Sequence, residues 1–100
     1  MDSETRLLYW LLDASRGGPT RVKILRNLVK KPSNLRQLSI SVNLDYKTVQ
    51  GHIELLIENG IIETPKKGYG SIYFINRGWM ENEYLKQVLL GDKNGKKGKK

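Results

Sequence analysis

Two helical segments flank a connection of only two residues, Asn43-Leu44, which constrains the fold more than any other feature of the sequence. The first segment, residues 35–42, follows Asn34, a favourable N-cap residue. The second begins after Asp45, another favourable N-cap, and ends at Gly60, which suits a left-handed residue beyond a helix C-terminus. Because so short a connection makes the two helices cross steeply, the first turn of the second helix should project from the globule.

Three further helices are predicted from apolar residues at three- and four-residue spacing. The first should cover residues 4–15, with Ser3 as its N-cap, and the sequence "RGGP" should end it. The second should start near Pro19 and end at Lys30 or Lys31, and the last should cover about residues 79–90. The expected buried stripes, in chain order, are Leu7, Leu8, Leu11 and Leu12; Val22, Leu25, Leu28 and Val29; Leu35 and Leu38; Val49, Ile53 and Leu56; and Met80, Tyr84, Leu85, Val88 and Leu89.

After Gly60 the helical pattern gives way to short extended runs. "IIET" at residues 61–64 and "SIYFI" at residues 71–75 predict β-strands, and "PKKGYG" between them predicts the turn of a hairpin with a basic tip. We therefore expect one mainly α-helical domain over residues 1–90 with a small β-hairpin. Its element order is that of a winged helix-turn-helix, flanked by N- and C-terminal helices.

The charge of the chain favours a polyanionic partner. There are 18 Lys+Arg residues against 10 Asp+Glu, a formal charge of +8, which favours nucleic acid or an acidic membrane surface. In the winged arrangement the helix over about residues 45–59 would enter the major groove of double-stranded DNA. The hairpin over about residues 64–71 would lie on the backbone or in the minor groove. The expected DNA contacts are Tyr46, Lys47, Thr48, Gln50 and Gly51 in this recognition helix, Arg36 before it, and Lys66, Lys67 and Tyr69 in the hairpin.

These residue types suit contact with DNA. Lysine and glutamine reach base edges or phosphates, and threonine contacts a phosphate or a thymine methyl group. Basic residues also dominate the segment from Arg16 to Lys47, where Asp45 is the only acid, and a phosphate-facing surface explains this imbalance better than a merely solvated face. They are Arg16, Arg21, Lys23, Arg26, Lys30, Lys31, Arg36 and Lys47.

Three sequence patterns lie between Arg21 and about Ile75. They are R-x-x-I-L in the first core helix, L-x-x-L in the second, and T-V-x-x-H-[IL]-x-x-L-x-x-x-G-[IL]-[IV] from the recognition helix into the first strand. The chain carries them at Arg21, Ile24, Leu25, Leu35, Leu38, Thr48, Val49, His52, Ile53, Leu56, Gly60, Ile61 and Ile62. This run resembles the archaeal winged-helix transcription regulators grouped with the ArsR and MarR families, and the resemblance implies their fold and DNA binding.

The chain departs from this family at two points. Metal-sensing ArsR relatives use clusters of cysteine or histidine, which are lacking here, so that metal sensing is not expected. The position of Gly51 often carries arginine in such helices; glycine costs about 1 kcal/mol of helix propensity relative to alanine. It could allow close approach to DNA, or it could weaken sequence readout. We expect His52 to be half-buried rather than to be a ligand.

Both terminal helices lie outside the minimal winged unit and carry more apolar surface than a lone surface helix needs. We expect them to pack together across a two-fold axis in a homodimer. Two recognition helices would then lie one DNA turn apart, about 34–36 Å. The residues expected at this interface are Leu7, Leu8, Trp10, Leu11, Tyr84, Leu85, Val88 and Leu89.

Residues 91–100 are expected to form a disordered basic tail. Five lysines and one aspartate give this segment half of the net charge, and no apolar residue is available for burial. Contact with phosphates outside the core site is favoured over a role in solubility alone.

Several other classes of function are disfavoured. Without cysteine there is neither a disulfide nor a thiolate metal site, and one histidine leaves little for a zinc site or a catalytic relay. No nucleophile–base pair, paired acids or phosphate loop indicates an enzyme, and no cofactor is expected. "LLYWLL" is too short to span a bilayer, and "MDSETR" before it is unlike a signal peptide. We therefore expect a cytoplasmic protein without membrane contact.

Three functions remain open. The leading hypothesis is a sequence-specific, homodimeric DNA-binding transcriptional regulator. The alternatives are a nucleoid-type architectural protein with low sequence specificity, which Gly51 and the basic tail would suit, and a winged helix that binds another protein.

Overall fold

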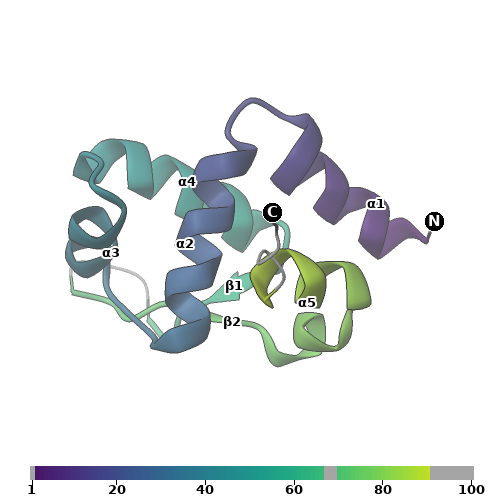
Figure 1. Cartoon of the computed structure of the whole chain (residues 1–100). Helices are drawn as coiled ribbons and strands as arrows, with labels where there is room; N and C mark the ends of the chain where they lie inside the picture. Colours follow the sequence, from purple (N-terminus) through teal and green to yellow (C-terminus); the bar gives the residue numbers. More distant parts are fainter. Residues whose placement is uncertain (1, 67–69, 91–100) are drawn as a thin grey trace.

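The computed structural model describes residues 2–66 and 70–90 (Figure 1). In this view α3 and α4 lie at one end of the molecule, α2 runs through its middle, the small hairpin lies below α4, and α1 and α5 lie at the other end. In chain order the elements are α1 (Ser3–Tyr9), the π-helical turn η1 (Trp10–Ala14), α2 (Gly18–Lys30), α3 (Leu35–Val42), α4 (Tyr46–Glu58), β1 (Ile62–Glu63), β2 (Phe74–Ile75), the 3-10 turn η2 (Arg77–Glu81) and α5 (Glu83–Leu90).

The first helix differs from its prediction at both ends. Its N-cap is Asp2 rather than Ser3, since the Thr5 N–H donates to Asp2 Oδ1 at 2.7 Å. The helix widens at Trp10 into η1, where the Ser15 N–H donates to the Trp10 carbonyl at 3.0 Å. Prediction of one regular helix over residues 4–15 is therefore wrong.

The second helix has the predicted bounds within one residue, with Pro19 in its first turn. Its buried stripe is different from the predicted one. Ile24, Leu25 and Leu28 are buried, whereas Val29 is 37% exposed. The stripe is set by the crossing of α2 with η1, α3 and α5, which rotates Ile24 inward and Val29 outward.

The helix-turn-helix forms as the sequence predicts. Asn34 and Gln37 make a reciprocal capping box at the start of α3, with bonds of 2.8 and 2.9 Å. Asn43 ends this helix in a left-handed conformation, φ 58°, which asparagine tolerates better than most residues. Asp45 caps α4 by accepting the Thr48 N–H at 3.1 Å, and Gly60 follows α4 with φ 76°.

The hairpin is shorter than predicted and has an additional partner. β1 and β2 are antiparallel, with Ile62 opposite Ile75 and Glu63 opposite Phe74, so that most of residues 61–64 and 71–75 are not strand. Ser33, between α2 and α3, forms an isolated bridge with Tyr73 through bonds of 3.1 and 2.8 Å. This bridge fixes the base of the hairpin to the helix-turn-helix.

The predicted last helix over residues 79–90 is divided in two. η2 ends at Glu81, and Asn82 then starts α5 by accepting the Leu85 N–H on its side-chain oxygen at 3.0 Å. Asn82 also donates to Thr5 Oγ1 at 3.2 Å. The interruption thus holds the start of α5 against α1.

The leucines of the two terminal helices are buried within their own chain. Leu8, Leu11 and Leu85 have no exposed surface, and Leu89 is 7% exposed, because α5 packs against both α1 and α2. Assignment of these four leucines to a dimer interface is therefore wrong: a single chain already buries them. Trp10 remains exposed, and Leu7, Tyr84 and Val88 are half-buried.

Candidate nucleic-acid interface

The first turn of α4 presents polar side chains to solvent. Tyr46, Lys47 and Thr48 are exposed and Gln50 is half-buried, while Val49 between them is fully buried. Burial of Val49 fixes the rotation of α4 and leaves these four neighbours on its outer side. The exposed first turn predicted from the sequence is therefore confirmed.

Thr48 is tied to the helix cap. Its hydroxyl donates to Asp45 Oδ1 at 2.6 Å, and its N–H donates to Oδ2 of the same carboxylate. These two bonds hold the pKa of Asp45 below its ordinary value. Because the hydroxyl proton is already donated, a phosphate contact by Thr48 would break this bond, whereas its methyl group stays available to an apolar contact such as a thymine methyl.

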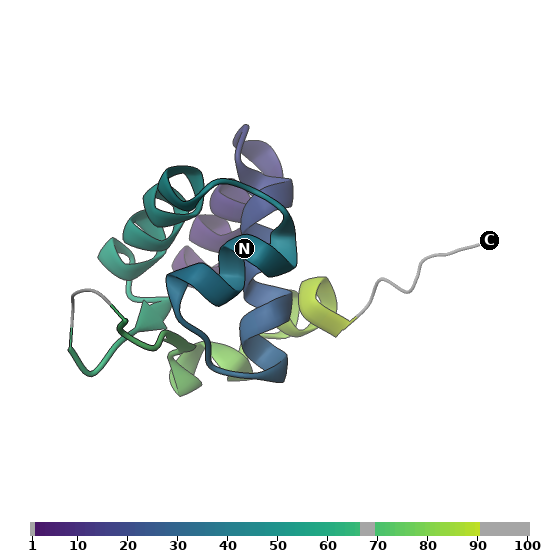
Figure 2. The same cartoon turned by 90° about the vertical axis from the view of Figure 1, so that its left-hand side faces the viewer.

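Three elements meet in a recess beside this turn. Its volume is about 120 Å³, and it is lined by Asn34, Leu35 and Arg36 from α3 and its cap, Tyr46 from α4, and Gly70 from the hairpin. Figure 2 looks onto the side of the molecule where α3 and α4 lie beside the hairpin. The structure thus brings together Arg36, Tyr46 and the hairpin, which are far apart in the sequence.

The hairpin loop is closed by side-chain bonds to one carbonyl group. Thr64 Oγ1 donates to the Lys66 carbonyl at 3.3 Å, and the Ser71 hydroxyl donates to the same oxygen. The Lys66 side chain is exposed beside this closure. The other two predicted hairpin contacts, Lys67 and Tyr69, lie outside the described residues.

Tyr73 links the hairpin to α4 and was not singled out from the sequence. It is 7% exposed, and burial, followed by the proximity of Tyr46 and Glu54, raises the pKa of its hydroxyl. The signal that could have found it is the two-residue period of a strand, which places Tyr73 on the same face of "SIYFI" as Ile75. In the structure these two residues are buried and Ile72 is exposed. Through its bonds to Ser33, Tyr73 holds the hairpin against the segment between α2 and α3.

Gly51 lies on the exposed side of α4 with open space around it. A Cβ atom at this position would meet no atom of the chain within 4 Å. Packing within the protein therefore does not require glycine here.

The basic surface predicted between Arg16 and Lys47 loses two of its members. Arg21 is 5% exposed, and its guanidinium is bonded inside the protein. Arg26 donates from Nε and Nη2 to the Val88 carbonyl of α5, at 3.2 and 2.9 Å. Both side chains satisfy internal acceptors, so their inclusion in a phosphate-facing surface is wrong. The side chains that stay exposed are Arg16, Lys23, Lys30, Lys31, Arg36 and Lys47.

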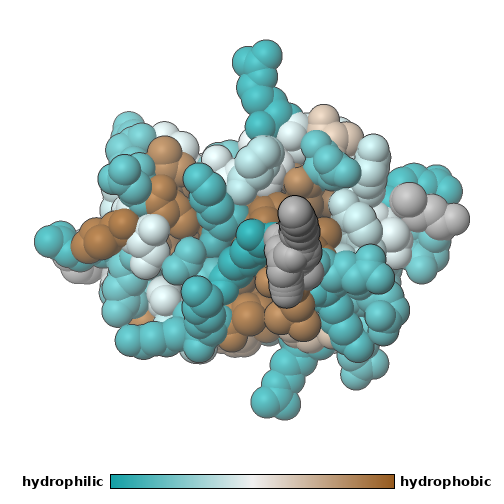
Figure 3. Space-filling model, in the orientation of Figure 1, coloured by the Kyte–Doolittle hydropathy of each residue, from teal (hydrophilic) through white to brown (hydrophobic). Residues whose placement is uncertain are grey.

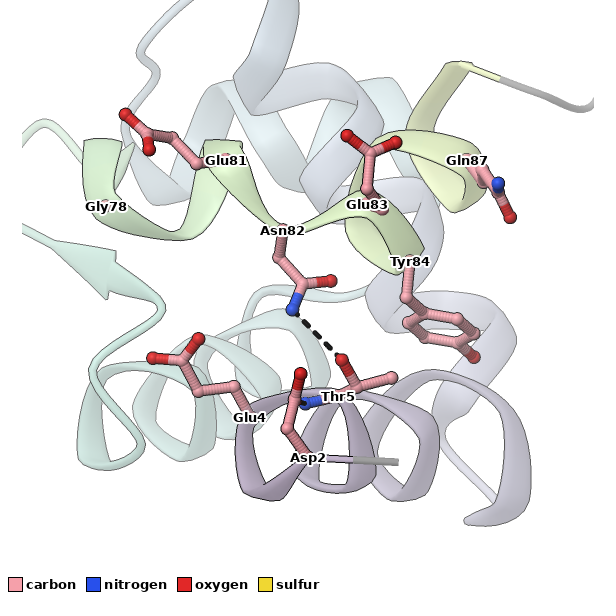
Figure 4. A pocket seen from close by; sticks show the side chains of 9 residues that line it. All are labelled: Asp2, Glu4, Thr5, Gly78, Glu81, Asn82, Glu83, Tyr84 and Gln87. Atoms are coloured by element: carbon pink, nitrogen blue, oxygen red, sulfur yellow. Dashed lines mark hydrogen bonds between the residues drawn. The ribbon is translucent and has the colours of Figure 1, made fainter.

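A larger hollow, about 620 Å³, lies at the other end of the molecule between α1 and the η2–α5 segment. Figure 4 shows its acidic lining, Asp2, Glu4, Glu81 and Glu83, around the bond from Asn82 to Thr5. Four carboxylates repel phosphate, so this end is unsuited to DNA.

Within the described ranges no group of three or more His, Asp or Glu side chains is placed to hold a metal ion. Among those same residues, no helix has the length and apolar character needed to cross a bilayer.

Several hydrophobic side chains remain on the surface, as the separate brown areas in Figure 3 show. On the terminal helices Trp10 is 52% exposed, Tyr9 43% and Leu90 58%. Tyr9 packs against Tyr84 of α5 with ring centroids 6.4 Å apart. The most exposed large apolar side chain of the described residues is Ile40 on α3, at 71%.

Comparison with known proteins agrees with this architecture. No protein-family model matches the chain. Over 57 residues, 57% of its length, the chain is 32% identical to an uncharacterized HTH-type transcriptional regulator, MJ1398, of Methanocaldococcus jannaschii. It spans only 15% of the length of that relative.

Three solved structures are similar in fold. The homodimeric winged helix-turn-helix DNA-binding domain of Mb0332 from Mycobacterium bovis, a possible ArsR-family regulator, has a TM-score of 0.66 at 17% identity and covers 96% of this chain and 91% of its own. The transcriptional repressor BigR from Xylella fastidiosa scores 0.64 at 21% identity, over 85% and 76% of the two chains. The PcaV regulator from Streptomyces coelicolor scores 0.57 at 19% identity, over 86% and 74%. The chain therefore has the winged helix-turn-helix fold, which confirms the resemblance seen in the sequence.

Proposed function

We propose that this chain is a sequence-specific DNA-binding domain of a transcriptional regulator, with α4 in the major groove and the hairpin on the backbone or in the minor groove. The observation that carries the proposal is the exposed first turn of α4 beside a recess that it shares with α3 and the hairpin. Arg36, Lys47 and Lys66 are all exposed in these three elements. Phosphate contacts from such residues fix register, and side chains of the recognition helix read bases.

The comparisons support this function. The similar domain of Mb0332 is described as DNA-binding and homodimeric, BigR as a transcriptional repressor, and MJ1398 as a transcriptional regulator. These descriptions share with the proposal either DNA binding or the regulation of transcription, and the Mb0332 domain also shares the winged helix-turn-helix fold.

Substitution of the recognition helix tests the proposed groove face. Lys47→Ala and Gln50→Ala should each weaken binding to a selected DNA site by about 1–2 kcal/mol, within the range for a good base contact. Fluorescence anisotropy with a site selected from random DNA measures the affinity. Lys86→Ala on α5 is the matched control, and it should bind as the unmodified chain does. Equal affinities for all four proteins would exclude α4 as the reading helix, provided that melting curves show unchanged folding.

We also propose a homodimer, with the exposed surface of the terminal helices as the interface. The four buried leucines are excluded from this surface. Trp10, Leu7, Tyr84 and Val88 are kept from the predicted set, and the exposed Tyr9 is added to them. Large aromatic side chains that are half exposed are the residue type enriched at interface hot spots.

Trp10→Arg should therefore raise the dimer dissociation constant by about 30-fold, the equivalent of about 2 kcal/mol at a hot spot. Sedimentation equilibrium measures this change. Ile40→Arg places the same charge on an exposed apolar position of α3 and should leave the dimer intact. A monomer in the unmodified protein, or equal effects of the two substitutions, would contradict the assignment.

The architectural alternative is favoured by one observation. Gly51 leaves the exposed side of α4 without a side chain at a position facing outward, which reduces the number of groups available to read bases. The two functions differ in the ratio of affinities for selected and bulk DNA.

A further inference from the structure

Arg21 is the one charged side chain that is buried in the described part of the chain. Its Nε donates to the Leu11 carbonyl at 2.8 Å, its Nη2 to the Ser15 hydroxyl, and its Nη1 lies 3.1 Å from His52 Nδ1. Among the described residues no acidic side chain pairs with this guanidinium. A buried cation is therefore held by neutral acceptors from η1, from the turn before α2 and from α4.

The contact with His52 fixes the state of its imidazole. A guanidinium has five N–H donors, no acceptor and a charge that it does not lose in proteins. Nδ1 must therefore accept, which places the imidazole proton on Nε2 and leaves the ring neutral. A proton on Nδ1 would face the N–H of Arg21, and two cations would lie 3.1 Å apart.

Gly17 shows how closely the turn fits this pair. A Cβ atom at Gly17 would lie 2.6 Å from Arg21 Nη1 and 2.7 Å from His52 Cε1. Because distances below 3.0 Å require one partner to move, a side chain at position 17 would displace the end of Arg21 or of His52. The turn, α2 and the middle of α4 are thus packed together around one guanidinium–imidazole contact.

We propose that Arg21 and neutral His52 are positioning residues that hold the recognition helix α4 in its DNA-binding orientation, and that protonation of His52 releases this hold. The inference rests on the proposed DNA-binding function. His52 is half-buried and lies one turn after Thr48, on the same side of α4, so that its contact with Arg21 lies directly beside the groove face. The site is a proton-sensitive contact between the reading helix and α2, beside the turn that joins η1 to α2.

The groups around His52 determine the sign of the effect. α2 contributes Arg21, whose charge is the one that acts on the imidazole; the turn contributes Ser15 and Gly17, which do not titrate, and Arg16, which is exposed. Burial first, and then the charge of Arg21, lowers the pKa of His52 from its ordinary value. Since the folded state binds the proton more weakly than the unfolded state, the stabilisation is complete above the ordinary pKa and declines as pH falls toward the lowered one.

The chain holds a single histidine, which makes the test direct. Because only one set of imidazole signals is present, an NMR titration needs no assignment. We expect His52 to titrate below the ordinary histidine pKa of about 6.5. Arg21→Met should move this titration upward, because it removes the neighbouring charge. An unshifted titration in both proteins would overturn the contact.

DNA binding measures the positioning role. Between about pH 7.5 and about pH 5.5 histidine is the side chain that ordinarily changes charge. Over this interval the affinity of the unmodified chain for a selected site should fall by less than about tenfold, which is the loss that one proton with the ordinary histidine pKa would cause by pH 5.5. His52→Gln keeps an acceptor for Arg21 but cannot be protonated in this range, so its affinity at neutral pH should be retained and its acid sensitivity lost. The same acid-dependent loss in His52→Gln would overturn the proposal.

The experiment separates this inference from the proposed function. If the unmodified chain binds no DNA at any pH, the function fails, but the pH dependence of the melting temperature still tests the contact. On acidification, the melting temperature of the unmodified chain should then fall further than that of His52→Gln. Parallel melting profiles of the two proteins would overturn the positioning role as well.

Discussion

Replacement of Leu85 by alanine should lower the free energy of unfolding by about 2–5 kcal/mol, the range for removing a large buried aliphatic side chain. Leu85 has no exposed surface and lies on α5, where this helix packs against α1 and α2. Alanine removes apolar burial and leaves a cavity that helices on both sides can only partly fill. Urea denaturation at fixed protein concentration measures the change.

Leu90→Ala is the matched control on the same helix. Leu90 is 58% exposed, and its truncation should change stability by less than about 0.5 kcal/mol. A large loss at position 85 and a small one at position 90 would show that α5 is part of the core of each chain. Equal, small losses at both positions would mean that α5 is not packed as described.

Replacement of Gly18 by alanine should cost about 2–3 kcal/mol, toward the upper end of the usual range for overpacking. A Cβ atom there would lie 2.6 Å from the Leu12 carbonyl oxygen and 2.7 Å from its carbon. Both are backbone atoms of η1, so no flexible side chain can move aside. The start of α2 would have to shift away from η1, and urea denaturation would report the loss.

Gly51→Ala is the control for helix propensity alone. The space around Gly51 is open, and alanine in the interior of an exposed helix should raise stability by about 0.5–1 kcal/mol. Opposite signs at positions 18 and 51 would support the close approach of α2 to η1. A stabilising effect at both positions would contradict it.

The parts of the fold that the sequence predicted are those that depend on local hydrogen bonds. The caps at Asn34 and Asp45, the short turn at Asn43-Leu44 and the left-handed Gly60 each involve residues no more than a few positions apart. The helix-turn-helix and the exposed first turn of α4 followed from these signals.

The parts that it missed depend on contacts between distant elements. Widening of the first helix at η1 and the rotation of α2 that buries Ile24 instead of Val29 are set by packing across the core. The same is true of the restart of the last helix at Asn82, whose side chain bonds to Thr5. Regular spacing of leucines did not reveal any of them, because it indicates a helix without indicating its partners.

Arg21 shows how charge alone misled the prediction of the site. It was counted with the exposed basic residues, although it lies three and four positions before Ile24 and Leu25 and therefore on the same side of the helix. That spacing was the available signal that it points inward.

The recess at the first turn of α4 could not be predicted in the same way. Tyr46 and Arg36 are predicted as DNA contacts on separate helices, and the recess brings them together with the hairpin. The hairpin is bonded to the helix-turn-helix by the Ser33–Tyr73 bridge, which no local pattern indicated.

The most direct test of the proposed function is a competition titration between a DNA site selected from random sequence and bulk DNA at physiological salt. A sequence-reading α4 predicts a preference of about 10³-fold or more for the selected site. Affinities that agree within about tenfold would contradict sequence-specific recognition and favour the architectural alternative. Absence of any DNA binding, even at low salt where phosphate contacts are strongest, would contradict the DNA-binding function altogether.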